Sequence, residues 1–419
     1  MKNGGFGRRF FCAFVFRAVS FLQRDRQAVA KKNLRRMRAR RGGKGEEHRL
    51  AELDRAEVMR NQRVRMHNGR PGLRVKTRRP ASRKPSGYAE RHRRPLRDDL
   101  AMIRCTHLAL LTLALACAAC SRPAGDAAQA AASADAAGKT LAEARAGVAT
   151  KLITHNRGGE APPAPPSGVL DLIHYDAPAG KLAAYLTPRP ATPGKHPAII
   201  WISGGDSNTI GDFWSPQPRE NDQSAAAFRA AGIVTMYPSL RGGNDNPGER
   251  EGFYGEVQDI LAAADHLAKL DYVDPQRIYL GGHSTGGTLV LLVAQIDPRF
   301  RDVFSFGPVA DVSGYGQDML PVSLSDEREI RLRSPGYWLG SIRGPVFVFE
   351  GDHDANTDQV ELLRESSKNP KAQFFVVPRA DHFSVLAPTT ELIAKKILAD
   401  TGAQTTIGFS EAELEGLLK

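Results

Sequence analysis

Cysteine is missing from most of this chain. The four cysteines, Cys12, Cys105, Cys117 and Cys120, all lie in the first 120 residues. The rest of the chain therefore has no disulfide to stabilise it and no thiolate to bind a metal. The chain also lacks the HExxH zinc motif, the phosphate-binding GxxxxGK loop and a GxGxxG turn that opens a helix. We therefore expect neither a metal nor a cofactor.

Acidic residues are scarce at one end of the chain. Residues 1–100 contain 30 Lys and Arg but only 9 Asp and Glu, whereas residues 101–419 contain 28 and 37. The formal net charge of +12 therefore comes from the N-terminal end, and we expect no nucleic-acid binding by the rest. Residues 1–101 also lack a sustained apolar period, which predicts a disordered segment.

A short apolar segment follows the basic one. Residues 102–120 run from Met102 through one arginine, a mostly apolar stretch and small residues to Cys120. This is the pattern of a secretory signal peptide, and it is too short to span a bilayer. The small residues before Cys120 resemble a bacterial lipobox, in which the cysteine is acylated; Cys117 is the alternative. We therefore expect the true start at Met102 and secretion across the inner membrane. The product would be lipid-anchored on the periplasmic or outer-membrane face.

Strand and helix patterns alternate after an Ala/Pro/Gly-rich linker that we assign to residues 121–167. Apolar strands are predicted in VLDLIHYDAPAGKLAAYLTP (a hairpin), HPAIIWISGG, IVTMYPS, RIYLGG, DVFSFGP, PVFVFEG and AQFFVVP. Helical spacing occurs in DQSAAAFRAAG and YGEVQDILAAADHLAKL. Residues 168–400 therefore predict an α/β domain with a doubly wound, mostly parallel sheet flanked by helices. Residues 401–419 predict a tail whose short helix begins at a Ser410–Glu413 capping box.

The stretch IYLGGHSTGG places a serine between glycines, after a strand pattern and before a helical one. A sharp strand-to-helix turn of this kind exposes the serine hydroxyl, and Gly282 and Gly286 allow close backbone approach. Ser284 is therefore the candidate nucleophile.

Two further residues follow later strands at the same predicted edge of the sheet. Asp354 closes the turn EGDHD after PVFVF, and His382 follows AQFFVVP. A serine hydroxyl needs a base to accept its proton, and the base needs a carboxylate to orient it. We assign these roles to His382 and Asp354, with Asp352 and Asp311 as alternative acids. His283 and His353 are expected to pack in the core or to support the catalytic residues, and not to act as catalysts themselves.

These residues amount to a family resemblance. The span from about 170 to 400 resembles the α/β-hydrolase fold, in particular the catalytic domain of the prolyl oligopeptidase and dienelactone hydrolase branch. The segments that carry the resemblance are PSLRGGNDNPG, YVDPQRIYLGGHSTGG and RSPGYWLGSIRGPVFVFEGDHD. The resemblance implies an oxyanion hole from the N–H of Thr285 and one in WISGGD, from Gly204 or Gly205. Ser203 stands where relatives often have histidine.

The leading functional prediction is a serine hydrolase that acts on small carboxylic esters, because an ester needs less precisely timed protonation than an amide. The alternatives are a serine peptidase of the prolyl oligopeptidase type on short peptides, and a non-catalytic binding lipoprotein. Aromatic candidates for the pocket are Phe213, Trp214, Tyr315 and Tyr337.

Overall fold

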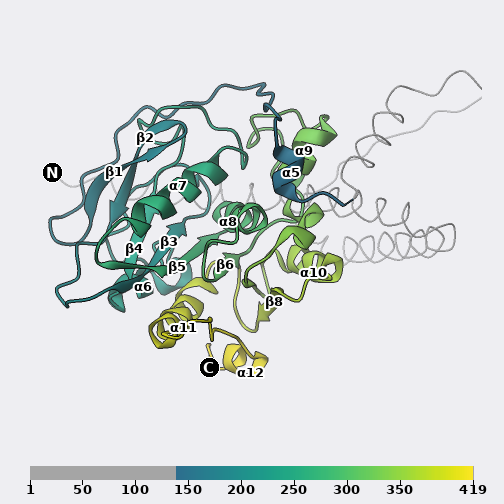
Figure 1. Ribbon diagram of the computed structural model, residues 1–419. Helices are drawn as coiled ribbons and strands as arrows, with labels where there is room; N and C mark the ends of the chain where they lie inside the picture. The colour runs from purple at the N-terminus through teal and green to yellow at the C-terminus, as the bar shows by residue number, and fades with distance from the viewer. Residues whose placement is uncertain (1–137, 419) are drawn as a thin grey trace, which may run out of the picture. The chain divides into compact units, whose positions relative to one another are not determined.

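The computed structural model describes residues 138–418. Their main feature is one eight-stranded sheet of order β1-β2-β4-β3-β5-β6-β7-β8 (Figure 1). The strands are β1 (Asp171–Ala177), β2 (Gly180–Leu186), β3 (His196–Ile202), β4 (Val234–Pro238), β5 (Val273–His283), β6 (Val303–Phe306), β7 (Val346–Gly351) and β8 (Ala372–Val377). Only the pairings of β2 are antiparallel, and β4-β3-β5-β6-β7-β8 pair in parallel. The predicted mostly parallel α/β sheet is confirmed.

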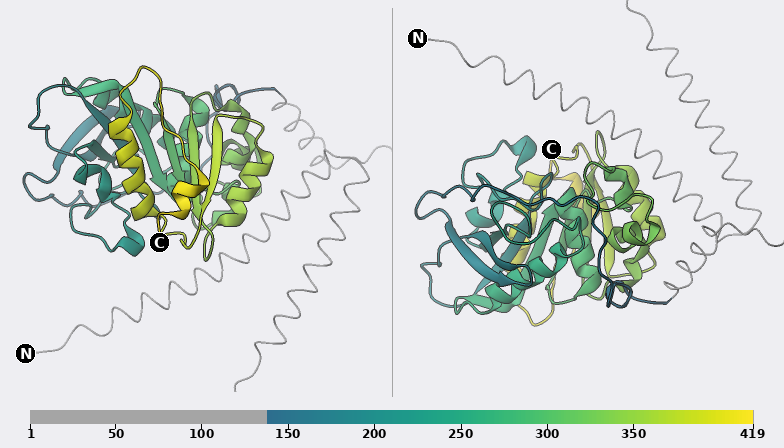
Figure 2. Two further views of the ribbon diagram at one scale, coloured as in Figure 1. Left: turned by 90° about the horizontal axis from the view of Figure 1, so that it is seen from below. Right: turned by 90° about the horizontal axis from the view of Figure 1, so that it is seen from above.

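Helices cover both faces of this sheet (Figures 1 and 2). They are α5 (Leu141–Arg145), α6 (Ala226–Ala230), α7 (Glu256–Ala268), α8 (Thr285–Ile296), α9 (Glu327–Arg333), α10 (Thr357–Ser366), α11 (Leu386–Ala399) and α12 (Glu411–Glu415). Short 3₁₀ helices are η1 (Arg219–Asn221), η2 (Val312–Tyr315), η3 (Pro335–Tyr337) and η4 (Leu339–Ser341).

Two apolar clusters lie on opposite faces of the sheet because strand side chains alternate between faces. In β3, Ile200 joins the cluster formed with α7, α8 and α10, whereas Ile199 and Trp201 join the cluster formed with α6 and α11. Both faces of the sheet are thus buried, and the carboxyl ends of its parallel strands remain as the edge on which a site can form.

The segment before β1 packs on the domain, although the sequence predicts a linker there. Thr140 caps α5 with a capping box, and Leu141 is fully buried. The guanidinium of Arg145 donates to the main-chain oxygens of Phe253, Tyr254 and Leu332 at 2.8–3.1 Å. The linker prediction is therefore wrong for residues 138–145, because these contacts fix the segment to the loop before α7 and to the end of α9.

The tail after residue 400 is also packed. Its predicted capping box is confirmed, since Ser410 and Glu413 bond reciprocally at the start of α12. Leu414 and Ile407 join the apolar cluster of α11. The predicted signal segment, Cys120 and residues 1–101 lie outside the described residues. Among residues 138–418, none of the helices has the length and apolarity that crossing a membrane requires.

Candidate active site

Ser284 lies at the junction of β5 and α8, as the sequence predicts. Its backbone has φ 56° and ψ −114°, a strained conformation for a residue with a side chain. The turn is held by a hydrogen bond of 2.7 Å from the Ser284 N–H to the carbonyl of Phe306 on β6. The strand, the turn and the helix therefore present this hydroxyl at the carboxyl edge of the sheet.

Glycine is required on both sides of Ser284. A Cβ on Gly282 would lie 2.7 Å from the carbonyl oxygen of Gly286, and a Cβ on Gly286 would lie 2.3 Å from that of Ile202. Either contact is too short for a real side chain, so the predicted close backbone approach is confirmed. These contacts bring the turn against the end of β3.

His382 lies in the turn between β8 and α11, beside the nucleophile turn. Its ring centroid is 4.6 Å from that of His283, the residue that precedes Ser284. Its Nδ1 is 2.9 Å from Oε2 of Glu350, and the His382 side chain is 12% exposed. A carboxylate that accepts from Nδ1 fixes the ring tautomer, which leaves the lone pair on Nε2.

Glu350 is the next-to-last residue of β7, and its side chain is fully buried. Its Oε1 accepts from the N–H of Gly351 at 2.9 Å, and its Oε2 accepts from the N–H of Asn356 at 3.0 Å. Together with His382, three N–H donors therefore face this carboxylate. Buried charges need such partners, and these donors also fix the direction of the carboxylate toward the imidazole.

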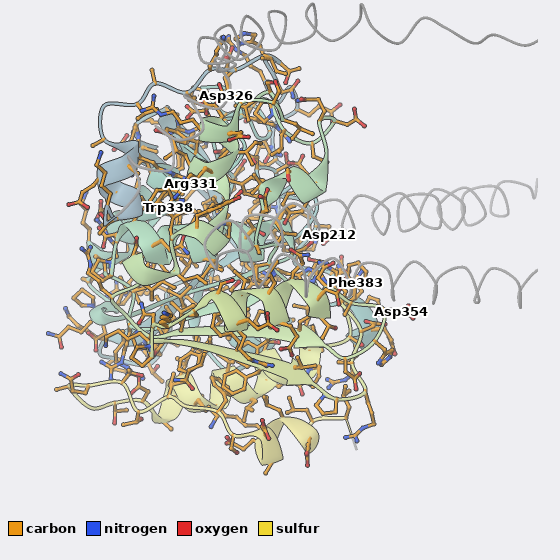
Figure 3. The ribbon with its side chains drawn as sticks, turned by 90° about the vertical axis from the view of Figure 1, so that its right-hand side faces the viewer. Asp212, Asp326, Arg331, Trp338, Asp354 and Phe383 are labelled. Carbon is orange, nitrogen blue, oxygen red and sulfur yellow. The ribbon has the colours of Figure 1, made fainter. Side chains whose placement is uncertain are left out.

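The sequence-based assignment of Asp354 as the acid is corrected, because Glu350 occupies the Nδ1 side of His382. Asp354 is exposed, with φ 46°, and Figure 3 shows it at the rim of the molecule. It lies beyond the end of β7, four positions after the residue that faces the histidine. The strand end, and not the turn that follows it, supplies the carboxylate.

The alternative acids also have other contacts. The carboxylate of Asp352 accepts from Nδ1 of His353 at 2.7 Å and from the N–H of Arg379 at 3.0 Å. Asp311 caps η2 by accepting from the N–H of Ser313, and it accepts from the Tyr337 hydroxyl at 3.2 Å. They brace loops around the site.

Two glycines that sequence reasoning missed bring the acid and the base together. A Cβ on Gly307, which has φ +56°, would lie 2.5 Å from Cε1 of His382 and 2.8 Å from Oε2 of Glu350. A Cβ on Gly351 would lie 2.2 Å from the carbonyl oxygen of Ala380, two residues before the histidine. Both positions must lack a side chain for the pair to form.

The loop after β3 runs along the other side of the nucleophile. A Cβ on Gly204 would be 3.1 Å from Cβ of Ser284, but the Gly204 N–H donates to Oε1 of Gln223 at 3.1 Å. The next residue, Gly205, is exposed, and its carbonyl accepts from the Thr285 hydroxyl at 3.0 Å. Of the two predicted donor positions on this loop, Gly204 is thus already hydrogen-bonded.

The main-chain N–H of Thr285 lies at the start of α8. The N–H groups in the first turn of a helix have no acceptor within the helix. In α8, the hydrogen bond of 2.9 Å to the carbonyl of Ser284 is donated by Thr288, three residues after Thr285. The helix start can therefore supply a donor, aided by the positive end of the helix dipole.

The four aromatic candidates for the pocket are all partly buried, but they lie in different surroundings. Tyr315 is nearest to the nucleophile turn, because its hydroxyl is 2.8 Å from that of Thr288, one helical turn after Ser284. Phe213 packs on Tyr237 and Trp214 on Tyr185, with ring centroids 4.9 and 5.5 Å apart. The hydroxyl of Tyr337 bonds Asp311. Their contact with a substrate stays a prediction.

A surface cavity of about 540 Å³ lies apart from this chemistry. It is lined by residues of β1, α7 and the end of α8, including Asp176, Leu261, Asp265 and Asp297. It contains neither Ser284 nor His382, so the functional assignment rests on the catalytic geometry and not on this cavity. Within residues 138–418, no three His, Cys, Asp or Glu side chains are grouped so that they could hold a metal ion.

Comparison with known proteins agrees with this geometry. Residues 220–397, which include the serine, the histidine and Glu350, match the model of the prolyl oligopeptidase family. This stretch of the chain is therefore similar to the proteins of that family. The described residues have the α/β-hydrolase fold, as the resemblance implies.

Individual relatives match over shorter stretches or at lower sequence identity. Dipeptidyl-peptidase 5 of Porphyromonas gingivalis is 33% identical over 113 residues, which is 25% of this chain and 16% of the relative. S-formylglutathione hydrolase of Mus musculus is 30% identical over 152 residues, which is 31% of this chain and 52% of that protein. A puromycin-hydrolyzing peptidase of Mycobacterium tuberculosis has 22% identity and a TM-score of 0.46, with 55% of this chain and 39% of that chain covered. The predicted preference for carboxylic esters is not confirmed by these matches.

Proposed function

We propose that this protein is a serine peptidase that cleaves short peptides through an acyl-enzyme formed on Ser284. The observation that carries the proposal is the buried hydrogen bond between Glu350 and His382 beside a strained nucleophile turn, within a stretch similar to the prolyl oligopeptidase family. The family match favours peptides over the esters that sequence reasoning ranked first.

The roles follow from what acyl transfer requires. Nε2 of His382 accepts the proton of the Ser284 hydroxyl as its oxygen attacks the carbonyl carbon of the scissile bond. The same nitrogen then gives this proton to the leaving amine, so that the amide bond breaks and the acyl-enzyme remains. Glu350 holds Nδ1 and stabilises the imidazolium that forms in between. A water molecule then attacks the acyl carbon and gives a proton to Nε2 of His382. The bond to Ser284 breaks, the serine oxygen takes that proton, and the carboxylic acid product leaves.

The negative charge on the substrate oxygen requires two donors. We assign them to the main-chain N–H groups of Thr285 and Gly205. Gly205 is favoured over Gly204 because the Gly204 N–H already donates to Gln223, and an oxyanion-hole donor must be available when charge develops.

Activity on chromogenic substrates tests the proposal. The purified full chain is assayed on aminoacyl and dipeptidyl p-nitroanilides and on p-nitrophenyl acetate and butyrate, with Ser284→Ala as the control for contaminating hydrolases. We expect turnover of at least one anilide that Ser284→Ala abolishes. Turnover of the esters alone, across a panel that includes prolyl and alanyl anilides, would contradict the peptidase assignment.

A small ester or thioester substrate is the second candidate. The match to the S-formylglutathione hydrolase covers 52% of the length of that hydrolase. The match to dipeptidyl-peptidase 5 covers 16% of the length of that peptidase. The match to this hydrolase supports the ester candidate, and the ratio of ester to anilide turnover in the same assay separates the two candidates.

We also propose that the protein is exported and lipid-anchored through Cys120. The motif MIRCTHLALLTLALACAAC supports this proposal, and it lies outside the described residues. Mass spectrometry of the protein from native membranes tests it: a mature chain that begins at an acylated Cys120 is expected. Peptides from residues 1–101 in the mature product would contradict it.

A further inference from the structure

His283 is a fully buried histidine that the proposed mechanism does not use. It ends β5 directly before Ser284, and its ring lies against the rings of His382 and Phe383, with centroid distances of 4.6 and 5.5 Å. Its two ring nitrogens face two different loops of the active site.

One ring nitrogen faces the loop of the catalytic histidine. Nε2 of His283 is 2.8 Å from the main-chain oxygen of His382. A carbonyl oxygen can only accept, so a hydrogen bond here requires the proton on Nε2 of His283. This bond fixes the backbone from which the catalytic imidazole extends.

The other ring nitrogen lies against the oxyanion loop. Nδ1 of His283 is 3.0 Å from Oε1 of Gln223, an oxygen that accepts from the N–H of Gly204. Gln223 is itself held, because its side-chain nitrogen donates to Oδ1 of Asn221 and its main-chain oxygen accepts from the indole N–H of Trp201. A Cβ on Gly204 would lie 2.8 Å from Nδ1 of His283, so the loop runs directly against the ring.

The charge of His283 is set by its surroundings. Burial, and then the neighbouring His382, hold the pKa of His283 well below its ordinary value, and His382 is the only titratable side chain among these contacts. A neutral ring has one proton to donate. Since His382 becomes cationic during acyl transfer, a neutral neighbour avoids a second positive charge at 4.6 Å.

We propose that His283 is a positioning residue for hydrolysis, which holds the main chain of His382 through a hydrogen bond donated by its Nε2. The inference rests on the proposed serine hydrolase function. With the proton on Nε2, Nδ1 has no hydrogen to donate to Oε1 of Gln223, so the ring meets the Gln223–Gly204 contact by packing and not by a hydrogen bond.

Three substitutions at position 283 distinguish a role of the His283 hydrogen bond in positioning His382 from a role of the ring in packing. His283→Phe keeps an aromatic ring and removes the hydrogen bond to the main chain of His382. His283→Gln keeps a donor near the position of Nε2, and His283→Asn keeps a polar group near that of Nδ1. We expect His283→Phe and His283→Asn to lower kcat by about 10- to 100-fold with little change in KM, and His283→Gln to recover most of it.

The readout is kcat per active site, with sites counted by fluorophosphonate labelling and folding checked by thermal melting. His353→Gln is the matched control, because the side chain of His353 is exposed and its ring bonds the neighbouring Asp352.

The outcomes are distinct. A wild-type protein without hydrolysis or labelling overturns the proposed function and the inference with it. An active wild type whose His283→Phe variant has the same kcat and KM overturns the inference alone. Equal losses in His283→Phe and His283→Gln would show that the donor at the position of Nε2 has no role, which also contradicts the inference.

Discussion

Oε2 of Glu350 lies 2.9 Å from Nδ1 of His382, and a glycine with a left-handed backbone, Gly307, leaves the space in which the two meet. This contact identifies the acid of the site. It also explains why a charged residue ends an otherwise apolar buried strand. The carboxylate is fully buried and faces three N–H donors, so it is positioned without help from solvent.

The first prediction compares two carboxylates. Glu350→Gln should lower kcat by about 10²- to 10⁴-fold, because an amide either loses the bond to Nδ1 or favours the wrong tautomer of His382. Asp354→Asn, at the exposed turn, should change kcat by less than about threefold. Steady-state kinetics on one substrate decides between them; a tolerated Glu350→Gln with a damaging Asp354→Asn would restore the original assignment.

The second prediction concerns Gly307. Gly307→Ala places a methyl group 2.5 Å from the His382 ring and requires a left-handed backbone for alanine, so activity should fall at least about 100-fold as the pair separates. Gly314→Ala is the control, because a Cβ there has nothing within 4 Å and φ is not positive. Equal activities of the two variants would refute the role of Gly307.

The third prediction concerns stability and pH. Asp302 is fully buried before β6; its Oδ2 accepts from Thr405 at 2.7 Å, while its Oδ1 has no hydrogen-bond partner among the described residues. Burial raises the pKa of Asp302 to about 7. The folded state therefore retains a proton that the unfolded state has lost between about pH 4 and 7, and stability falls as the pH rises through this window.

Asp302→Asn removes this titration. Its melting temperature relative to wild type should therefore rise between pH 4 and pH 8, by several degrees at the upper end. Thermal melting at both pH values checks the prediction. A difference between variant and wild type that is constant with pH would show that Asp302 does not titrate in this range.

The nucleophile and the base could be predicted because their signals are local. Ser284 is flanked by glycines between a strand and a helix, and His382 lies in the turn that follows the last strand. The hairpin of β1 and β2, the parallel strands and the capping box of α12 are local patterns too. Each depends on residues within a few positions of one another, where periodicity and capping chemistry are readable.

The acid and the supporting contacts could not be predicted in this way. Glu350 and His382 are 32 positions apart, and Gln223 and His283 are 60 apart, so only the folded sheet brings them together. One signal was available: a glutamate at the end of the fully apolar strand VFVFE is costly unless it has a partner. The turn residue Asp354 was the more familiar choice.

The segment before β1 shows the opposite error. Its Ala and Pro content indicates a linker, but Leu141 and Arg145 fix it to the domain through burial and through bonds to distant carbonyls. Composition averages over residues, whereas one part-buried guanidinium with several acceptors is enough to hold a short helix in place.

Fluorophosphonate labelling followed by peptide mass spectrometry tests the central claim most directly. The probe reacts with a serine only where a base activates it, so labelling reports the site without knowledge of the substrate. We predict one adduct, on the peptide that contains Ser284, which forms more than about 100-fold more slowly in Glu350→Gln and at an unchanged rate in Asp354→Asn. No adduct on Ser284 in the folded protein, or labelling that Glu350→Gln leaves unchanged, would contradict the account.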